Sequence, residues 1–351
     1  MSKDSFRPAP NRKAVSRRDF LRLGSIGGAA VALTACVPKP SPPAPEPPTP
    51  AWPPPGAPQV VPSPTPEKAA GLRIAHISDM HVEPGGPAIA GFKRALRHVH
   101  GLSPTVDFVL NTGDCIMDAL AADKEGAQRQ WNAFNGILEA ECRLPVYHAL
   151  GNHDVWGWGL PTAAQSEARS DPLFGKGMAL EQLRIPNRFY SFDRGGWRFL
   201  ILDSTHPPDI TPGKPYTGRI DEEQYLWLES QLQETAPSVP VCVVSHIPVL
   251  AACMFLDGDN ESSGNWVVPG AWVHIDARRL WELFWQHPNV RLCLSGHTHQ
   301  VEDLRYHGVK YLTNGAISAN WWNGDYFDFP PGYVVLTLYA DGSSESEFVA
   351  Y

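Results

Sequence analysis

The sequence has little positive charge for its length. Its 351 residues include 29 lysines and arginines against 37 aspartates and glutamates, so the formal net charge is -8. Proteins that bind nucleic acids usually carry a basic face whose charges displace condensed counterions from the phosphates. We therefore expect no nucleic-acid partner, although a small anionic substrate held by metal ions stays compatible with this charge.

Long hydrophobic runs are also scarce near the N-terminus. After a basic, polar opening, an apolar and small-residue stretch runs from about Leu21 to Ala35. A helix that spans a bilayer needs about 20 apolar residues, so this stretch is too short for one. Its position and composition are typical of an export signal instead.

Two short motifs flank this stretch. Arg17 and Arg18 in SRRDFL stand directly before it, and the segment resembles the twin-arginine signal of bacteria. LTAC, which ends at Cys36, resembles the lipobox of bacterial lipoproteins, whose cysteine becomes the lipid-modified first residue of the mature chain. These resemblances imply the twin-arginine export machinery as a partner, transport across the bacterial cytoplasmic membrane, and a periplasmic or cell-surface location with a lipid tether at Cys36. The alternatives are a chance arginine pair and a cleaved, soluble product in which Cys36 is incidental.

Proline, in contrast, is abundant. About half of the residues from Val37 to Pro66 are proline, and the whole chain has 35. Such a stretch lacks the N–H groups of a helix or strand ladder and favours extended polyproline II. A stiff spacer is expected over residues 37–70, between a signal at residues 1–36 and a folded domain at residues 71–351. A proline-rich ligand for a partner domain is the competing interpretation.

Cysteines are few, and their spacing is not that of a cross-linked fold. Six occur, and the five beyond Cys36 lie at positions 115, 142, 242, 253 and 293. Their number is odd and zinc-ribbon spacings are absent, which argues against a disulfide framework and against a cysteine-held zinc. These five cysteines are expected to be small, reduced side chains of the core.

Beyond residue 70, short apolar runs alternate with helical patterns. The runs that predict buried strands are 72–78, 107–112, 145–150, 197–204, 239–245 and 289–295. Helical spacing predicts helices near 88–99, 124–140, 221–233 and 276–286. This alternation indicates an α/β fold with a largely parallel sheet that is covered on both faces. The tail predicts further strands without helices between them, so we expect a mixed sheet, with a doubled sheet as an option.

Polar side chains that can bind metals follow five of these strands. In chain order, the strands are followed by Asp79 and His81, by Asp114, by Asn152, His153 and Asp154, by His246, and by His297 and His299. The carboxyl ends of strands in an open α/β sheet form the crevice where ligands bind. We therefore expect these side chains to meet at one edge. His76 and His148 lie within strands and are expected to belong to the core or to support the site.

Seven of these side chains offer the donors of a metal site: two aspartates, one asparagine and four histidines. A single tetrahedral zinc takes about four ligands, so seven suit two ions. If Asp114 bridges, each ion receives four protein ligands, and a shared hydroxide and solvent complete the shells. Two ions about 3.5 to 4 Å apart lower the pKa of a bound water and clamp both oxygens of a displacement at phosphorus. The set therefore predicts hydrolysis of a phosphoester.

The order DxH, GD, GNHD, H and GHTH resembles the calcineurin-like metallophosphoesterase superfamily over residues from about 72 to 350. The resemblance implies a four-layer α/β/β/α sandwich of two mixed sheets. The implied ligands of one divalent ion are Asp79, His81 and His299. Those of the other are Asn152, His246 and His297, with Asp114 shared. The resemblance also implies that His153 protonates the leaving oxygen or steadies the phosphoryl charge, and that Asp154 orients its ring.

Two single residues refine this chemistry. Because the pKa of a histidine is about 6.5, His153 can carry a proton near neutral pH and give it to a leaving alkoxide. Met117 stands where purple acid phosphatases of the same superfamily have a metal-ligating tyrosine, three residues after the aspartate of the GD motif. An iron–tyrosinate centre is therefore not expected, and manganese, ferrous iron or zinc fit the donors without distinction.

Loop residues near the motifs bear on the substrate. Loop tryptophans could stack on a base or an aryl group, or could instead pack their loops onto the sheets; they are Trp156, Trp158, Trp266, Trp321 and Trp322. The segment from Met254 to Pro269 carries Asp257, Asp259 and Glu261, whose charges would repel a highly charged substrate and so favour a phosphodiester. The alternatives are a phosphomonoesterase, such as a phosphatase or nucleotidase, and a non-catalytic metal-binding lipoprotein of the same fold.

Overall fold

The computed structural model describes residues 71–207 and 215–351, whose strands form two large sheets and one small sheet. The first large sheet contains, in spatial order, β13 (Ser344–Ala350), β12 (Gly332–Leu338), β1 (Leu72–Ile77), β2 (Phe108–Asn111) and β3 (Val146–His148). The second contains β10 (Val301–Tyr306), β11 (Val309–Asn314), β9 (Val290–Ser295), β8 (Val241–Val244), β5 (Trp197–Ile201) and β4 (Tyr190–Arg194). The small sheet pairs β6 (Thr205–His206) with β7 (Thr217–Gly218). Both large sheets mix parallel and antiparallel neighbours.

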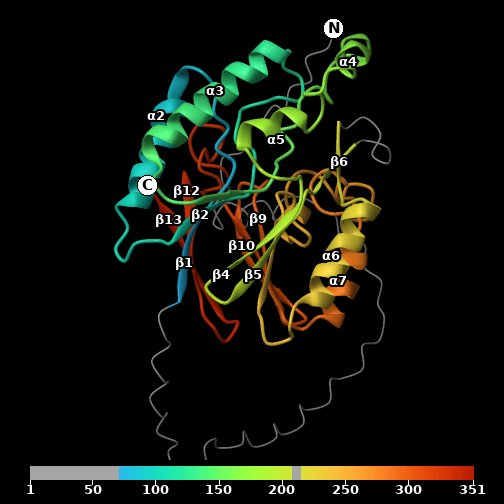
Figure 1. Cartoon of the computed structure of the whole chain (residues 1–351). Coiled ribbons are helices and arrows are strands. Elements are labelled where there is room, and N and C mark those ends of the chain that lie inside the picture. Colours follow the sequence, from blue (N-terminus) through green and yellow to red (C-terminus); the bar gives the residue numbers. More distant parts are fainter. Residues whose placement is uncertain (1–70, 208–214) are drawn as a thin grey trace, which may run out of the picture. The chain divides into compact units, whose positions relative to one another are not determined.

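Helices cover the outer faces of the two large sheets. The structure has α2 (Gly86–His100), α3 (Lys124–Glu141), α4 (Thr162–Ala168), α5 (Gly177–Leu183), α6 (Glu222–Glu234), α7 (Ala277–Gln286) and the short 3₁₀ helix η1 (Cys253–Phe255). Figure 1 shows α2 and α3 on one side of the sheets and α6 and α7 on the other. The predicted four-layer α/β/β/α sandwich of two mixed sheets is therefore confirmed.

Three apolar cores explain why these runs form strands. In β1, Ala75 and Ile77 face the core under α2 and α3, whereas Ile74 faces the core between the two sheets. In β8, Cys242 and Val244 likewise face the other sheet, and their neighbours face α6 and α7. Because successive strand residues point to opposite faces, the sequence of a strand that is buried on both faces is a nearly continuous run of apolar residues.

The strands that the sequence pattern did not predict lie mainly at sheet edges. β13, β10 and β4 each have a single large-sheet neighbour, and many of their side chains are exposed. An edge strand carries polar and charged residues, which also protect it from pairing with other chains. Its sequence therefore lacks the apolar run that marks a central strand.

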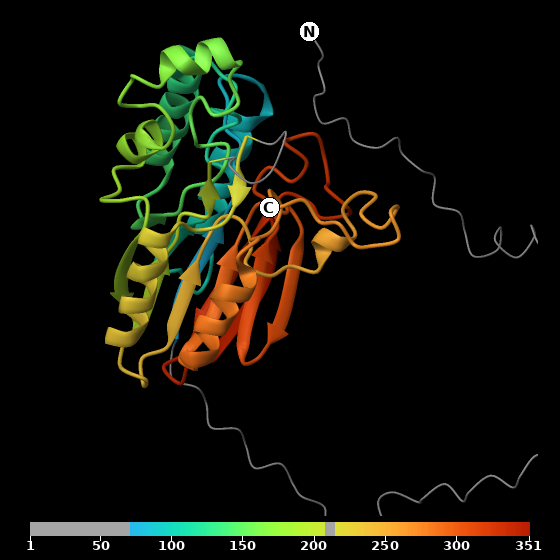
Figure 2. The same ribbon diagram turned by 90° about the vertical axis from the view of Figure 1, so that its right-hand side faces the viewer.

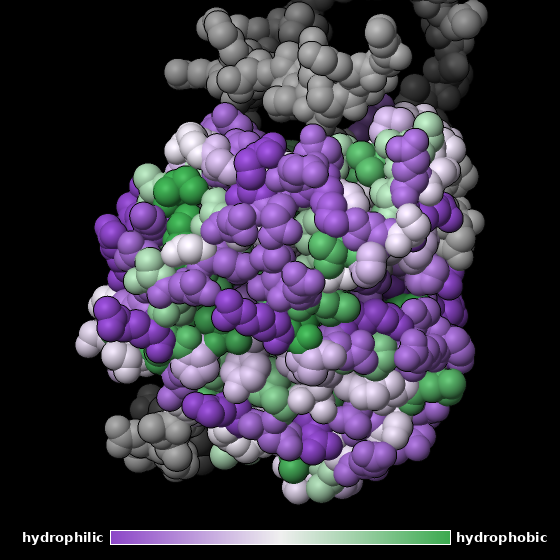
Figure 3. Space-filling view, turned by 45° about the horizontal axis from the view of Figure 1, so that its top comes forward, coloured by the Kyte–Doolittle hydropathy of each residue, from purple (hydrophilic) through white to green (hydrophobic). Residues whose placement is uncertain are grey.

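Two further expectations concern cysteines and hydrophobic helices. All five cysteines in the described residues are free; Cys115, Cys242 and Cys293 are buried as expected, whereas Cys142 and Cys253 are only half-buried. Among the described helices, none combines the length and the apolar character needed to cross a membrane. Figure 3 shows a mainly hydrophilic face with hydrophobic residues in small, separate patches. The signal, the lipobox and the proline-rich spacer lie outside the described residues.

The five strands that carry the metal-type residues belong to two sheets rather than one. β1, β2 and β3 are parallel neighbours in the first sheet, and β8 and β9 are parallel neighbours in the second. The loops that follow these strands gather at one end of the sandwich (Figures 1 and 2). The crevice is therefore built between the carboxyl ends of two stacked sheets.

Candidate metal centre

Most of the predicted ligands lie in strained turns directly after strands. Five of them have a positive φ, a backbone conformation that residues other than glycine adopt rarely: Asp79 (55°), His81 (43°), Asp114 (52°), His297 (69°) and His299 (56°). Each such residue costs of the order of 1–3 kcal/mol. Hydrogen bonds between turns support the conformation, since Asp79 N donates to Gly113 O (3.0 Å) and His81 N to Asp114 O (3.0 Å). Strain of this kind is concentrated at functional sites.

Glycines allow these turns to approach one another. A side chain at Gly151 would collide with the backbone and the carboxylate of Asp114. A side chain at Gly296 would collide with Ser78 and with the Asp79 carboxylate. The bare backbone instead lets His297 N donate to Asp79 Oδ2 at 3.0 Å. The GNHD and GHTH motifs therefore need their glycines for close packing around the two aspartates.

The first group of ligand atoms belongs to Asp79, His81 and His299, which are all buried. His81 Nε2 lies 3.1 Å from His299 Nε2, and His299 Nε2 lies 3.4 Å from Asp79 Oδ1. His299 Nδ1 donates to Ala319 O (2.5 Å), so its Nε2 presents a lone pair. Asp79 Oδ1 is buried and has no hydrogen-bond partner in the described structure. A cation between these atoms would satisfy that oxygen and both ring nitrogens.

The second group contains Asn152, His246 and His297. His246 Nε2 lies 3.0 Å from Asn152 Oδ1 and 3.2 Å from His297 Nδ1. The opposite ring nitrogens donate to backbone carbonyls, His246 Nδ1 to Thr112 O (2.9 Å) and His297 Nε2 to Ala271 O (3.0 Å). These bonds direct the other nitrogen of each ring, His246 Nε2 and His297 Nδ1, into the group, which is the arrangement found in histidine ligands of metals.

Asp114 lies between the two groups. Its Oδ2 is 3.3 Å from His246 Nε2 and 3.7 Å from His81 Nε2, while its Oδ1 accepts from His153 N (2.8 Å). The structure thus brings all seven candidate residues together at one site, with Asp114 between the two groups. The donor set fits two divalent ions.

The charges of this site also suit cations. Burial lowers the pKa values of His81 and His297 to about 3, so both rings are neutral. Burial alone would lower the pKa of His246 as well, but the Asp114 carboxylate and other acids raise it to about 9. Burial would raise the pKa of Asp79, yet His299 and other histidines bring it down to about 2. Two carboxylates therefore stay ionised, and a cation would displace the proton on His246.

The structure corrects the role predicted for Asp154. Its buried carboxylate accepts from the backbone N–H groups of Gly151 (2.8 Å), Asp114 (3.0 Å) and Cys115 (2.8 Å). The ring of His153 is instead oriented by Met117 O, which accepts from Nδ1 at 2.8 Å. The prediction that Asp154 orients His153 is therefore wrong. Asp154 holds the turn that presents Asp114, and burial together with the Asp114 charge raises its pKa to about 6.

Three of the tryptophans near the motifs contact different parts of the molecule. Trp322 packs its loop, because its ring lies against Gly91 and its Nε1 donates to Met80 O and His81 O (both 3.1 Å). Trp156 is buried and also packs its loop. Trp321 lies over the metal centre, with ring centroids 4.2 Å from His299 and 5.6 Å from His81.

Sequence reasoning missed several groups that hold the ligands in place. The carbonyl groups of Thr112, Met117, Ala271 and Ala319 orient four histidines, and the ring of Tyr326 lies 5.5 Å from that of His299. Every residue carries a carbonyl, so no residue type signals this role. Positive φ values at Ala319 and Trp321 are equally invisible in the sequence.

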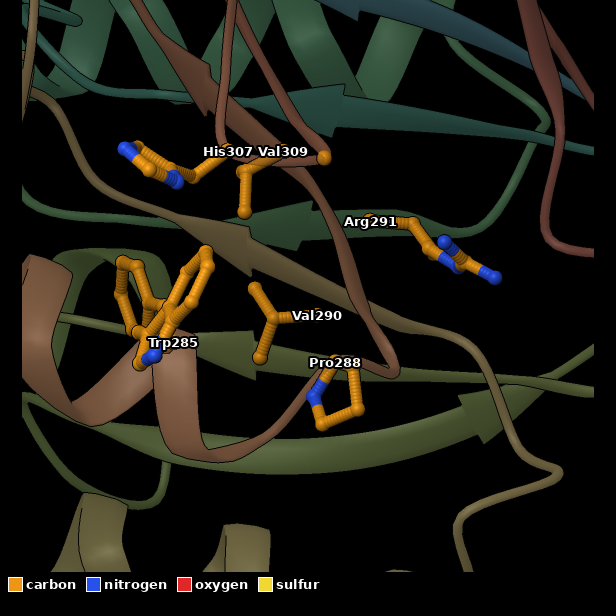
Figure 4. A pocket seen from close by; sticks show the side chains of 8 residues that line it. Trp285, Pro288, Val290, Arg291, His307 and Val309 are labelled. Atoms are coloured by element: carbon orange, nitrogen blue, oxygen red, sulfur yellow. The ribbon is translucent and has the colours of Figure 1, made fainter.

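A separate pocket of about 260 Å³ lies away from these ligands (Figure 4). Its lining includes Trp285, Pro288, Val290, Arg291 and His307. Val290 begins β9, whereas the GHTH motif follows its last residue, so the pocket and the metal centre lie at opposite ends of this strand. The pocket has no carboxylate, and it is not a second metal site.

Comparison with known proteins agrees with the geometry. The profile of the family described as calcineurin-like phosphoesterase matches residues 72–301, and the chain belongs to this family. It is therefore a hydrolase of phosphoric esters.

Individual relatives are more distant. The chain is 25% identical over 288 residues to a 3',5'-cyclic-nucleotide phosphodiesterase of Nostoc sp., covering 78% of this chain and 90% of that protein. It is 27% identical over 289 residues to the 3',5'-cyclic adenosine monophosphate phosphodiesterase CpdA of Escherichia coli, covering 79% and 89%. A dimetal phosphatase from Danio rerio has a similar fold, with a TM-score of 0.55, 16% identity and coverage of 80% and 96%.

Proposed function

We propose that the chain is a two-metal phosphodiesterase in which His153 supplies the proton for the leaving oxygen. The observation that carries this proposal is the orientation of the His153 ring. Its Nδ1 donates to Met117 O, so Nε2 is the atom that can exchange a proton with a substrate. Donor atoms of His81, Asp114 and His153 lie within 4.8 Å of one another, which puts this ring beside both ligand groups.

In this proposal the seven ligands hold the metal ions, and His153 protonates the leaving oxygen. Two divalent ions, when bound, would neutralise phosphate charge and lower the pKa of a water molecule. Asp114 accepts from His153 N, so the residue that would be shared by the ions also fixes the position of the acid. His153 is only half-buried, whereas Asp79, His81 and Asp114 are buried. A substrate can therefore reach Nε2, and the proton passes from that atom to the departing alkoxide.

Diesters are favoured over monoesters for two reasons. The relatives from Nostoc and Escherichia coli are named as cyclic-nucleotide phosphodiesterases. The segments 254–269 and 316–331, which meet beside the first ligand group, carry five carboxylates and no lysine or arginine. A monoester with two negative charges is repelled by such loops more strongly than a diester with one.

The test uses the full-length protein, stripped of metal and refilled with manganese, ferrous iron or zinc. We expect bis-p-nitrophenyl phosphate to be hydrolysed with a kcat/KM at least about tenfold above that of p-nitrophenyl phosphate. His153→Ala should lower kcat by about 100-fold for an alkyl leaving group and much less for p-nitrophenol, which leaves without a proton. The matched control is His307→Ala, in an exposed turn away from the ligands.

Three results would count against the proposal. A higher kcat/KM for the monoester would favour a phosphatase or nucleotidase. Full diester hydrolysis after replacement of both His153 and Asn152 by Ala would remove the proposed chemistry. If neither substrate is hydrolysed with any metal, in protein whose two ions are verified by elemental analysis, a non-catalytic metal-binding protein of this fold would be favoured.

We further propose that the chain is exported and tethered, with a signal at residues 1–36, a spacer at residues 37–70 and the catalytic domain at residues 71–351. The support is the sequence pattern around Arg17, Arg18 and Cys36. Replacing both arginines with lysine should block export in cells. Cys36→Ser should release the protein from the membrane fraction, whereas Cys142→Ser should not. Retention of Cys36→Ser in the membrane fraction would contradict the lipid tether.

A further inference from the structure

Three side chains form a corner beside the first ligand group. Trp321 and Tyr326 follow β11, and Asp257 belongs to the segment after η1. The rings of Trp321 and Tyr326 are nearly perpendicular, at 86°, with centroids 5.7 Å apart. Tyr326 OH donates to Asp257 Oδ2 at 3.5 Å. We call these three residues the acidic aromatic corner.

The corner adjoins the metal centre directly. Both rings contact His299, with centroid distances of 4.2 Å for Trp321 and 5.5 Å for Tyr326. The two segments that build it lie side by side in Figure 2, the orange one after η1 and the red one between β11 and β12. A phosphate held at the metal centre would therefore have its ester substituent within reach of the corner.

The charged side chains of the two segments that build the corner are all acidic. Segment 254–269 contributes Asp257, Asp259 and Glu261, segment 316–331 contributes Asp325 and Asp328, and neither segment contains a lysine or arginine. The corner combines two nearly perpendicular aromatic rings with a half-buried carboxylate and has no positively charged side chain of its own. This combination attracts organic cations and repels anionic substituents.

We propose that the acidic aromatic corner binds an ammonium group on the alcohol of a phosphodiester substrate, as in an ester of choline or ethanolamine. This inference rests on the proposed phosphodiesterase function and narrows its substrate class. The ammonium group lies on the short carbon chain next to the ester oxygen, so phosphate and cation can occupy the metal centre and the corner together. A neutral substituent gains no such attraction.

The test compares two substrates that differ only in charge. One is p-nitrophenyl phosphocholine, and the other is its carbon analogue, p-nitrophenyl 3,3-dimethylbutyl phosphate, in which a neutral tert-butyl group replaces the trimethylammonium group. In the full-length, metal-loaded protein we expect kcat/KM to be about tenfold higher for the choline ester, mainly through KM. Asp257→Asn and Tyr326→Leu should each reduce this ratio toward one. Tyr326→Phe should keep most of it, because the ring remains.

Asp259→Asn is the matched control, since Asp259 lies in the same segment and is exposed. It should change the ratio far less than Asp257→Asn. Equal kcat/KM for the two esters, or a preference that survives both Asp257→Asn and Tyr326→Leu at full metal content, would overturn the inference. If neither ester is hydrolysed, the proposed function fails separately. Binding of phosphocholine against 3,3-dimethylbutyl phosphate, measured by calorimetry, then decides the inference.

Discussion

The two ligand groups of the metal centre differ in charge and in cover. The first has its own carboxylate, Asp79, besides the shared Asp114, and its three residues are all buried. The second has the neutral amide of Asn152 in place of a second carboxylate, and its His297 is half-buried. Trp321 lies over the first group, at 4.2 Å from His299. These differences predict unequal affinities for the two ions.

Charge and burial both favour tighter binding of a divalent cation in the first group than in the second. A divalent cation in the first group would meet two carboxylates, and one in the second group would meet a single carboxylate that is already shared. Attraction between charges grows as water is excluded, so the buried group benefits more from each carboxylate. We therefore expect the first group to hold its ion more tightly, and the second ion to exchange more readily.

The shared carboxylate offers the largest test of this comparison. Asp114→Asn keeps the size of the side chain but removes the charge that both groups use. We expect the loss of both ions and a fall in diester hydrolysis of at least about 1000-fold. Elemental analysis and kcat/KM on bis-p-nitrophenyl phosphate give the two measurements. Asp193→Asn, which removes only a surface ion pair with Arg198, is the control. Retention of one ion would show that Asp114 serves a single group.

The two histidines of GHTH offer the next test. His299→Ala should empty the first group, and His297→Ala should empty the second, because the two rings aim at different neighbours. We expect one ion per chain in each variant and a fall in activity of about 100-fold. The remaining ion should resist a chelator longer in His297→Ala, which keeps the first group intact. Equal chelator resistance in the two variants would contradict the expected difference in affinity.

Much of this architecture was predictable from the sequence, for physical reasons. Central strands are buried on both faces, so β8 is a continuous apolar run and β1 is apolar except at Arg73 and His76. The ligands follow such strands, and their donor atoms are side-chain atoms that the residue type reveals. Edge strands such as β13 escaped prediction because polar residues dominate them.

The supporting contacts of the site were not predictable in the same way. Met117 orients His153 through its carbonyl, and Ala319 does the same for His299. Every residue has a backbone carbonyl group, so only the folded loops reveal which carbonyl groups orient a histidine ring. The pairing of Asp154 with His153, which the family resemblance implied, was wrong for a related reason. The turn points the carboxylate at three backbone N–H groups, and only the folded chain shows these contacts.

A smaller effect is expected from the cover over the first group. Trp321→Leu removes the ring that lies against His299 and leaves all seven ligands in place. We expect the affinity of the first ion to fall by about tenfold and that of the second to stay unchanged. Competition with a chelator measures both affinities. Trp266→Leu, on an exposed ring that contacts Phe255, is the matched control. An equal loss at both groups would show that Trp321 supports the whole loop rather than one ion.

The smallest expected effect concerns His148, a buried histidine outside both ligand groups. It tests how burial alone changes the pKa of a histidine. Burial lowers the pKa of His148 to about 4 in the folded chain, against about 6.5 when it is unfolded. Between about pH 6.5 and pH 4 the ring is therefore protonated in the unfolded chain but neutral in the folded chain. The free energy of unfolding is unaffected by this difference above about pH 6.5 and falls as the pH is lowered toward 4. In metal-free protein, His148→Gln should lose about 2 kcal/mol less of its free energy of unfolding between pH 8 and pH 5 than the parent chain does. Urea unfolding at the two pH values measures the difference, and His307→Gln, in an exposed turn, should behave like the parent. An identical loss in His148→Gln would mean that its ring is not held neutral by burial.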